Sequence, residues 1–182
     1  MTSPLLSSPG AVPATGPDEG VAAHYGDPYG EQRALAGPGG LVDRSHRGVI
    51  KITGPDRLSW LHSLTTQSLD RLPAGDTAGA LVLSPRGYVE HQLTLTDDGA
   101  ATWAHVEPGT AGPLLDFLTS MRFMLRVEPA DVTADYAVLT LMGTGLGDEL
   151  PGGAAATMTT PFQQDLVVAR PQIGRASCRE RV

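Results

Sequence analysis

The chain has 182 residues, of which 41% are hydrophobic and 18% charged, and its formal net charge is −7. This composition is typical of a soluble globular protein that is long enough for one domain with a real core, or for one domain and the start of another. The negative charge argues against a nucleic-acid or membrane partner held by bulk charge. No apolar run approaches the roughly 20 residues of a membrane span, and the first residues lack a secretory signal. We therefore expect a cytoplasmic protein.

The N-terminal segment shows little regular pattern. Residues 1–20 are rich in proline, serine and glycine and have no hydrophobic periodicity, so we predict a disordered lead-in. Residues 21–36 favour a short helix from about Pro28 onward, because proline is tolerated in the first helical turn. The Gly-Pro-Gly-Gly run at 37–40 is expected to end this helix.

A dense cluster of polar residues precedes the first strand. The run 43–47, DRSHR, is followed by 49–53, VIKIT, which predicts a strand with its two isoleucines on one face and Lys51 on the other. A catalytic cluster, a ligand-binding rim and a solvated turn are three interpretations of 43–47. We favour an ordered turn that leads into the sheet, with Arg47 reaching toward a ligand.

The following pattern indicates an α+β fold with a largely antiparallel sheet and helices on one face. Gly54-Pro55-Asp56 is typical of a helix start, and we expect that helix to continue until Pro73–Gly75. The further elements are predicted as strands at 80–83, 88–96 and 101–107, a helix at 111–121, and strands near 123–127 and at 135–143. Residues 144–164 are expected to be rich in loops.

The last ten residues differ from the rest of the chain. The segment 173–182, IGRASCRERV, resembles a translated sequencing adapter, so we exclude it from the fold and interpret 144–172 as a linker or the start of a truncated next domain. This tail holds the only cysteine, and the five histidines lack a ligand spacing. The body therefore offers no thiolate, and we predict no metal site.

Several residues of the predicted sheet are candidates for a binding site. His91 lies on the apolar face of its strand between Val89 and Leu93, where it is either a core histidine with satisfied ring nitrogens or a ligand contact. Trp103 and Glu107 share one strand face with His105, so these three residues either line a pocket or form an aromatic and polar edge.

These motifs together resemble a known family. Tyr25-Gly26, Glu31, the run DRSHRG at 43–48 and Gly54-Pro55-Asp56 are similar to the N-terminal signature of the glycine-cleavage T-protein superfamily. The hairpin around Gly87 and the strand DYAVLTLMG, 135–143, extend the resemblance over about 22–143. We therefore assign 21–143 to a T-protein-like folate-binding domain, the first part of a three-domain ring with folate in its central channel.

One departure from the T-protein pattern indicates a branch of the superfamily. T-proteins carry Asp-Asp-Leu in the return strand of the hairpin, with an aspartate implicated in methylene transfer to folate, whereas this chain has His91-Gln92-Leu93. Glu90 stands one place earlier, which in a regular strand is the other face. The chain thus looks more like the YgfZ-type branch, whose members bind folate and support iron–sulfur cluster assembly and repair.

The resemblance implies a cofactor, partners and site residues. Tetrahydrofolate or a derivative is the expected cofactor, and iron–sulfur client or assembly proteins are the expected partners. Folate needs an aromatic slot, orienting polar groups and a cation for its glutamate tail, roles that we assign to Arg47, His91, Trp103 and Glu107, with no catalytic residue. A folate-dependent aminomethyltransferase is the alternative, and a third possibility is that this fragment has no function alone.

Overall fold

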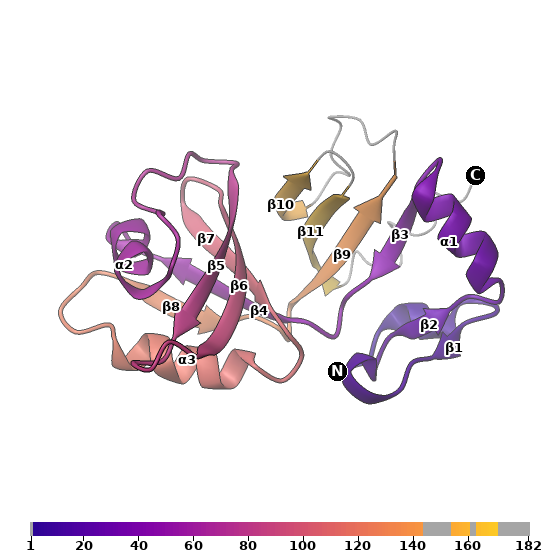
Figure 1. Ribbon diagram of the computed structural model, residues 1–182, viewed down its shortest axis with the longest axis horizontal. Helices are drawn as coiled ribbons and strands as arrows, with labels where there is room; N and C mark the ends of the chain where they lie inside the picture. Colours follow the sequence, from indigo (N-terminus) through magenta and orange to yellow (C-terminus); the bar gives the residue numbers. More distant parts are fainter. Residues whose placement is uncertain (1, 144–153, 161–162, 171–182) are drawn as a thin grey trace. The chain divides into compact units, whose positions relative to one another are not determined.

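The computed structural model describes residues 2–143, 154–160 and 163–170. The chain divides into two compact units, one built from 1–46 with 134–182 and the other from 47–133 (Figure 1). The domain predicted at 21–143 therefore takes in parts of both units. Sequence order alone does not reveal this division, because the two segments of the first unit are separated in the chain by the whole of 47–133.

The second unit is an antiparallel sheet with helices on one face, as predicted. Its strands lie in the order β5-β6-β7-β4-β8. The elements along the chain are β4 (Gly48–Thr53), α2 (Arg57–Leu64), β5 (Thr77–Leu83), β6 (Val89–Asp97), β7 (Ala101–Val106), α3 (Ala111–Ser120) and β8 (Glu128–Asp131).

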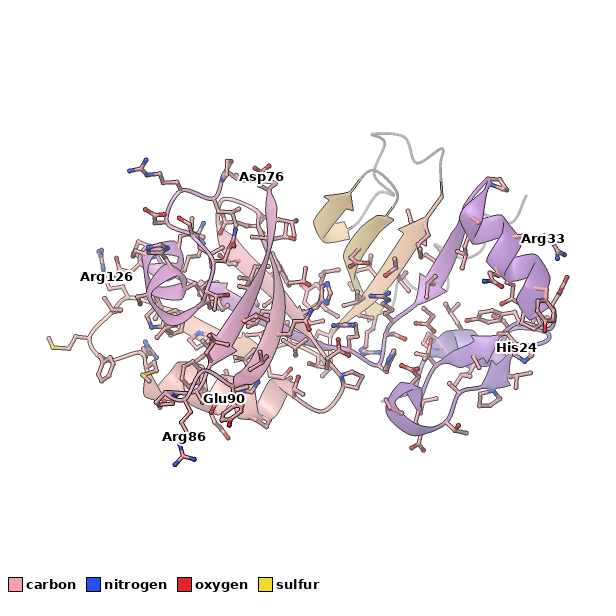
Figure 2. The ribbon with its side chains drawn as sticks, in the orientation of Figure 1. His24, Arg33, Asp76, Arg86, Glu90 and Arg126 are labelled. Carbon is pink, nitrogen blue, oxygen red and sulfur yellow. The ribbon has the colours of Figure 1, made fainter. Side chains whose placement is uncertain are left out.

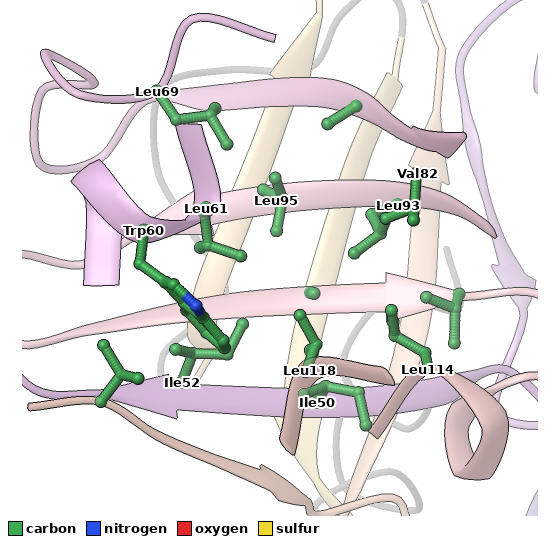
Figure 3. Packing of buried hydrophobic residues seen from close by; sticks show 14 of the residues in the cluster. Ile50, Ile52, Trp60, Leu61, Leu69, Val82, Leu93, Leu95, Leu114 and Leu118 are labelled. Carbon is green, nitrogen blue, oxygen red and sulfur yellow. The ribbon is translucent and has the colours of Figure 1, made fainter. Parts of the chain in front are cut away.

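One apolar core joins both helices to this sheet. Figure 3 shows Trp60 and Leu61 of α2, and Leu114 and Leu118 of α3, against the same sheet face. The strands contribute alternate residues to this core, because successive side chains of a strand point to opposite faces. These strand residues are Ile50, Ile52, Ala80, Val82, Leu93, Leu95, Ala104 and Val106.

The start of α2 is fixed by a close backbone approach. Gly54 has φ +107°, and a Cβ at this position would lie 2.0 Å from the carbonyl oxygen of Arg126. Asp56 then accepts hydrogen bonds from the Arg126 backbone N–H at 2.9 Å and from its guanidinium Nη2 at 3.0 Å. The Gly-Pro-Asp signal thus marks a helix start and also a clamp on the distant segment before β8.

Two boundaries in this unit differ from the sequence prediction. Helix α2 ends at Leu64, and Leu69 reaches the core from the following loop, where its N–H donates to His62 Nδ1 at 3.3 Å. The strand expected near 123–127 begins only at Glu128. The clamp on Arg126 and the left-handed backbone of Phe123, φ 45°, keep the preceding segment in a loop.

The described residues of the first unit form a four-stranded antiparallel sheet in the order β10-β11-β9-β3, a separate β1-β2 ribbon and one α-helix. The predicted helix from Pro28 is present. The elements are the 3-10 turns η1 (Pro4–Ser7) and η2 (Gly16–Asp18), β1 (Val12–Pro13), β2 (Ala22–His24), α1 (Pro28–Ala36), β3 (Gly40–Asp43), β9 (Tyr136–Met142), β10 (Ala154–Thr160) and β11 (Gln163–Ala169).

Three segments of this unit depart from expectation or lie outside the description. The lead-in expected to be disordered is ordered where described, because Leu5 is buried in a second core with Ala137, Leu139, Leu141 and Val168. Part of the segment expected to be rich in loops forms β10 and the start of β11. Residues 144–153, 161–162 and the adapter-like tail lie outside the described residues.

Within the described ranges, no helix is long and apolar enough to cross a membrane.

Candidate functional site

The sheet of the second unit has a polar face opposite its helices. The register places Lys51 of β4 and Thr96 of β6 beside Trp103 of β7, and it places Thr94 beside His105. These residues alternate along their strands with the core residues, so they point away from α2 and α3. We call this set, together with Arg47 and Glu107 at the strand ends, the polar face.

Trp103 is held rigidly on the polar face. Its indole N–H donates to Asp98 Oδ2 at 2.8 Å, and Lys51 Nζ lies 4.7 Å from the ring centroid. Burial raises the pKa of Asp98, but hydrogen bonds from Trp103 and from the Ala101 and Ala100 N–H groups outweigh this effect and keep the pKa below its ordinary value. Because Trp103 is only 4% exposed, a ligand ring that stacks on it must displace a neighbour.

Arg47 and Glu107 form an ion pair at one end of the polar face. The Nη2 of Arg47 donates to Glu107 Oε1 at 2.6 Å, as their places beside the paired residues Gly48 and Val106 allow. The Nε of Arg47 is buried and has no hydrogen-bond partner among the described residues. Glu107 thus neutralises the cation that was predicted to bind a folate tail, and an anionic ligand must compete with it.

His91 lies on the other face of the sheet. It stands opposite Val82 of β5, and its ring centroid lies 6.5 Å from that of Phe117 in α3, with the rings inclined at 35°. Burial lowers the pKa of His91, although the charge of Glu90 acts in the opposite direction. The Nδ1 atom is buried without a hydrogen-bond partner in the described part of the chain. A neutral imidazole with a free polar atom beside an aromatic ring is suited to contact a polar heterocycle.

The hairpin that carries His91 is irregular at this position. Val82 pairs with His91 but Leu83 pairs with Val89, so Glu90 is an extra residue in β6. Such a β-bulge disturbs the alternation of side chains and is often found next to functional sites. Figure 2 shows Glu90 and Arg86 at the same end of this hairpin. Sequence reasoning assumed a regular strand here and did not detect the bulge.

The four predicted site residues therefore do not surround one point. Arg47, Trp103 and Glu107 belong to the polar face, and the first and last of these are in direct contact. His91 belongs to the face that is covered by the helices. Their roles as folate contacts stay predictions, and the geometry restricts any single small ligand to one side of the sheet.

Three residues that contact the predicted site residues were not identified as site residues from the sequence. Lys51 and Asp98 fix Trp103, and Phe117 flanks His91. The strand pattern already placed Lys51 on the face opposite the two isoleucines, so alternation could have identified it as a residue of the polar face. Nothing in the sequence pairs Phe117 with His91, because the contact depends on how α3 crosses the sheet.

The polar run 43–46 is an ordered turn in the first unit rather than a hydrolytic site. The hydroxyl of Ser45 donates to Asp43 Oδ1 at 2.5 Å, while His46 Nε2 lies 3.1 Å from Asp18 Oδ1. A serine nucleophile needs a base that accepts its proton, and here the serine hydroxyl is bound to the carboxylate while the imidazole contacts another residue. No three histidine, cysteine, aspartate or glutamate side chains in the described ranges are grouped to hold a metal ion.

Comparison with known proteins agrees with this fold. Residues 28–148 match the family described as the GCVT N-terminal domain. An aminomethyltransferase of Chromobacterium violaceum is 29% identical over 121 residues, which are 66% of this chain and 33% of that protein. An aminomethyltransferase of Moorella thermoacetica is 26% identical over 136 residues, which are 68% of this chain and 34% of the relative. The chain thus spans about a third of the length of these two relatives.

Solved structures share the architecture at lower sequence identity. The glycine cleavage system aminomethyltransferase T from Bartonella henselae superposes with a TM-score of 0.77 and 18% identity, and the match covers 96% of this chain and 54% of that one. A chain of the heterotetrameric sarcosine oxidase from Corynebacterium sp. U-96 gives a TM-score of 0.50 at 16% identity, covering 79% and 83% of the two chains. At these identities the likeness concerns the fold.

Proposed function

We propose a function for this chain on the premise that it belongs to the GCVT N-terminal domain family. The chain binds tetrahydrofolate or a derivative, and the protein of which it is part assists iron–sulfur cluster assembly or repair. The observation that carries the proposal is the buried Nδ1 atom of His91, which has no partner among the described residues and lies beside the Phe117 ring.

The surroundings of His91 fit part of a folate molecule. Phe117 offers an aromatic wall, and the neutral imidazole offers one polar atom for a pterin edge. Aromatic and apolar walls with a few polar groups are typical of sites for small heterocycles. Arg47, Trp103 and Glu107 lie on the opposite face, so we assign the pterin to the His91 side.

Tetrahydrofolate supplies one-carbon chemistry when it is bound, and the residues of this chain favour binding over transfer. His91 and Gln92 occupy the places where a transferase of this superfamily carries two acids. A neutral imidazole does not provide the negative charge that such a carboxylate would hold next to the reacting nitrogen. Residues 1–172 contain no cysteine that could ligate a cluster. We therefore place cluster ligation in a partner protein.

A folate-dependent aminomethyltransferase is the second candidate function. The names of the two relatives above favour it, since both proteins are aminomethyltransferases. In the structure, Glu90 is the extra residue of the β-bulge in β6 and stands next to His91. A carboxylate is therefore present close to the positions where a transferase of this superfamily carries its two acids. A glycine-cleavage assay with lipoyl carrier protein separates the two: turnover that disappears in Glu90→Gln favours the transferase.

The folate proposal is tested by titrating the 182-residue chain with tetrahydrofolate under anaerobic conditions. We expect saturable binding that weakens at least tenfold in His91→Ala, with His24→Ala as the control because His24 lies in the first unit. Glu107→Ala tests the polar face, and we expect little change in that variant. Unchanged affinity in His91→Ala, with tenfold weaker binding in Glu107→Ala, would move the pterin to the other face of the sheet.

A further inference from the structure

The first unit contains two buried oxygen atoms whose environments point to a ligand. The hydroxyl of Tyr25 and the Oδ2 atom of Asp43 are both buried without a hydrogen-bond partner among the described residues. Asp43 is only 6% exposed. Leaving such a group unpaired costs about 1–3 kcal/mol, so native proteins pair nearly all of them, often through ordered water.

The fold brings these two oxygens to the same side of a sheet. Asp43 ends β3 opposite Leu139, whose side chain belongs to the second apolar core, and Tyr25 packs against that core. The other carboxylate oxygen, Oδ1, already accepts from the Ser45 N–H at 3.0 Å and from the Ser45 hydroxyl at 2.5 Å. The turn thus fixes the carboxylate and leaves Oδ2 free toward the core side.

Charge limits what can lie between these oxygens. The Asp43 carboxylate disfavours an anion, and the Arg170 guanidinium, which interacts electrostatically with Asp43, disfavours a cation. Burial, with the charges of Asp43 and Glu31, raises the pKa of Tyr25 to about 12, so its hydroxyl keeps its proton over the physiological range. The fitting molecule is therefore small, neutral and able both to donate and to accept a hydrogen bond.

We propose that the Tyr25 hydroxyl and Asp43 Oδ2 together bind one buried water molecule in the first unit. The water donates one hydrogen to Asp43 Oδ2 and forms its second hydrogen bond with the Tyr25 hydroxyl. Both oxygens are buried on the side of the second core and neither has a direct hydrogen-bond partner among the described residues, which is the arrangement that a bridging water satisfies. This water links the segment before α1 to the DRSHR turn. It also gives the buried Oδ2 atom of Asp43 a hydrogen-bond partner on a face that is otherwise apolar.

The direct test is a crystal structure of the 182-residue chain at a resolution that shows ordered water. We expect one water within hydrogen-bond distance of both oxygens, and its loss in a Tyr25→Phe crystal. The control is Tyr29→Phe, because Tyr29 is 74% exposed and its removal leaves the site intact. An ion at this position, a direct Tyr25–Asp43 hydrogen bond, or the absence of an ordered atom would each overturn the proposal.

A thermodynamic cycle provides an independent readout. Tyr25→Phe and Asp43→Asn each remove one side of the bridge, so the fall in melting temperature of the double variant should be smaller than the sum of the two single falls. Additive falls would contradict a shared water. If Asp43→Asn does not fold, the wild-type and Tyr25→Phe crystals still decide between the outcomes.

Discussion

Replacing Asp97 by asparagine should destabilise the second unit strongly. The Asp97 carboxylate accepts hydrogen bonds from Arg57 Nε and Nη2, both at 2.8 Å, from Thr102 Oγ1 at 2.6 Å and from the Gly99 N–H at 2.8 Å. The side chains of Arg57 and Asp97 are only 12% and 2% exposed. Asp97→Asn keeps the shape of the side chain but removes the charge and one acceptor oxygen.

The magnitude follows from leaving Arg57 without its counter-charge. Removing one partner of a buried ion pair typically costs ~3–5 kcal/mol. Arg57 keeps the Gly99 carbonyl at 3.0 Å and is slightly exposed, so we expect the lower end of that range. A loss of ~3 kcal/mol lowers the melting temperature of a chain of this size by roughly 6–12 °C, which circular dichroism measures directly.

The matched comparison is Asp56→Asn. Asp56 binds Arg126 through the same two guanidinium nitrogens, but the Arg126 side chain is 75% exposed, so solvent screens the pair and the loss should be much smaller. The reasoning is refuted if Asp97→Asn leaves the melting temperature unchanged, or if Asp56→Asn lowers it by as much.

The Asp97 pair also predicts a dependence on pH. Burial raises the pKa of Asp97, but the hydrogen bonds from Arg57, Thr102 and Gly99 outweigh burial and lower it overall. The stabilisation is therefore complete above the unfolded value, about 3.9, and is lost as the pH falls through the lower folded value. The stability difference between wild type and Asp97→Asn should shrink in the same acidic range.

Three further predictions use other parts of the chain. Gly54→Ala should lower the melting temperature far more than Gly75→Ala, since both glycines have positive φ but only a Cβ at Gly54 would meet a carbonyl oxygen at 2.0 Å; equal losses would contradict this. A difference titration at 295 nm between wild type and Tyr25→Phe should show one phenol ionising near pH 12, and stability should fall as the pH rises from about 10 toward that value; ionisation near pH 10 would disprove burial of this hydroxyl. Because burial lowers the pKa of His91, wild type should lose stability below about pH 6.5 relative to His91→Gln, and parallel pH profiles would refute this.

Local patterns predicted the elements of the second unit well. Alternation placed Leu93 on the apolar face of β6, where it is part of the core, and the Gly-Pro-Asp signal located the start of α2. These features depend on neighbours in the sequence, so the sequence contains the information needed to identify them. The prediction of a strand near 123–127 was wrong because that segment is held by a long-range contact. The hydrogen bonds between Asp56 and Arg126 join residues that lie seventy positions apart, and local sequence patterns do not reveal them.

The first unit was less accessible to sequence reasoning. Its lead-in has the composition of a disordered segment, yet Leu5 finds a place in a core formed mainly by β9 and β11. Long-range pairing, such as that of Leu41 with Leu141, leaves no local periodicity to detect. The candidate site shows the same limit: the contact of Arg47 with Glu107 follows from strand register, whereas the bulge at Glu90 and the Phe117 contact depend on tertiary structure.

Equilibrium binding of tetrahydrofolate tests the central claim most directly. Calorimetric titration of the folded 182-residue chain, with a cooperative melt measured on the same sample, should give saturable binding with about one site per chain. His91→Ala should abolish most of that affinity while it leaves the melt cooperative. A folded chain that shows no saturable binding, or a His91→Ala variant that binds as tightly as wild type, would contradict the account.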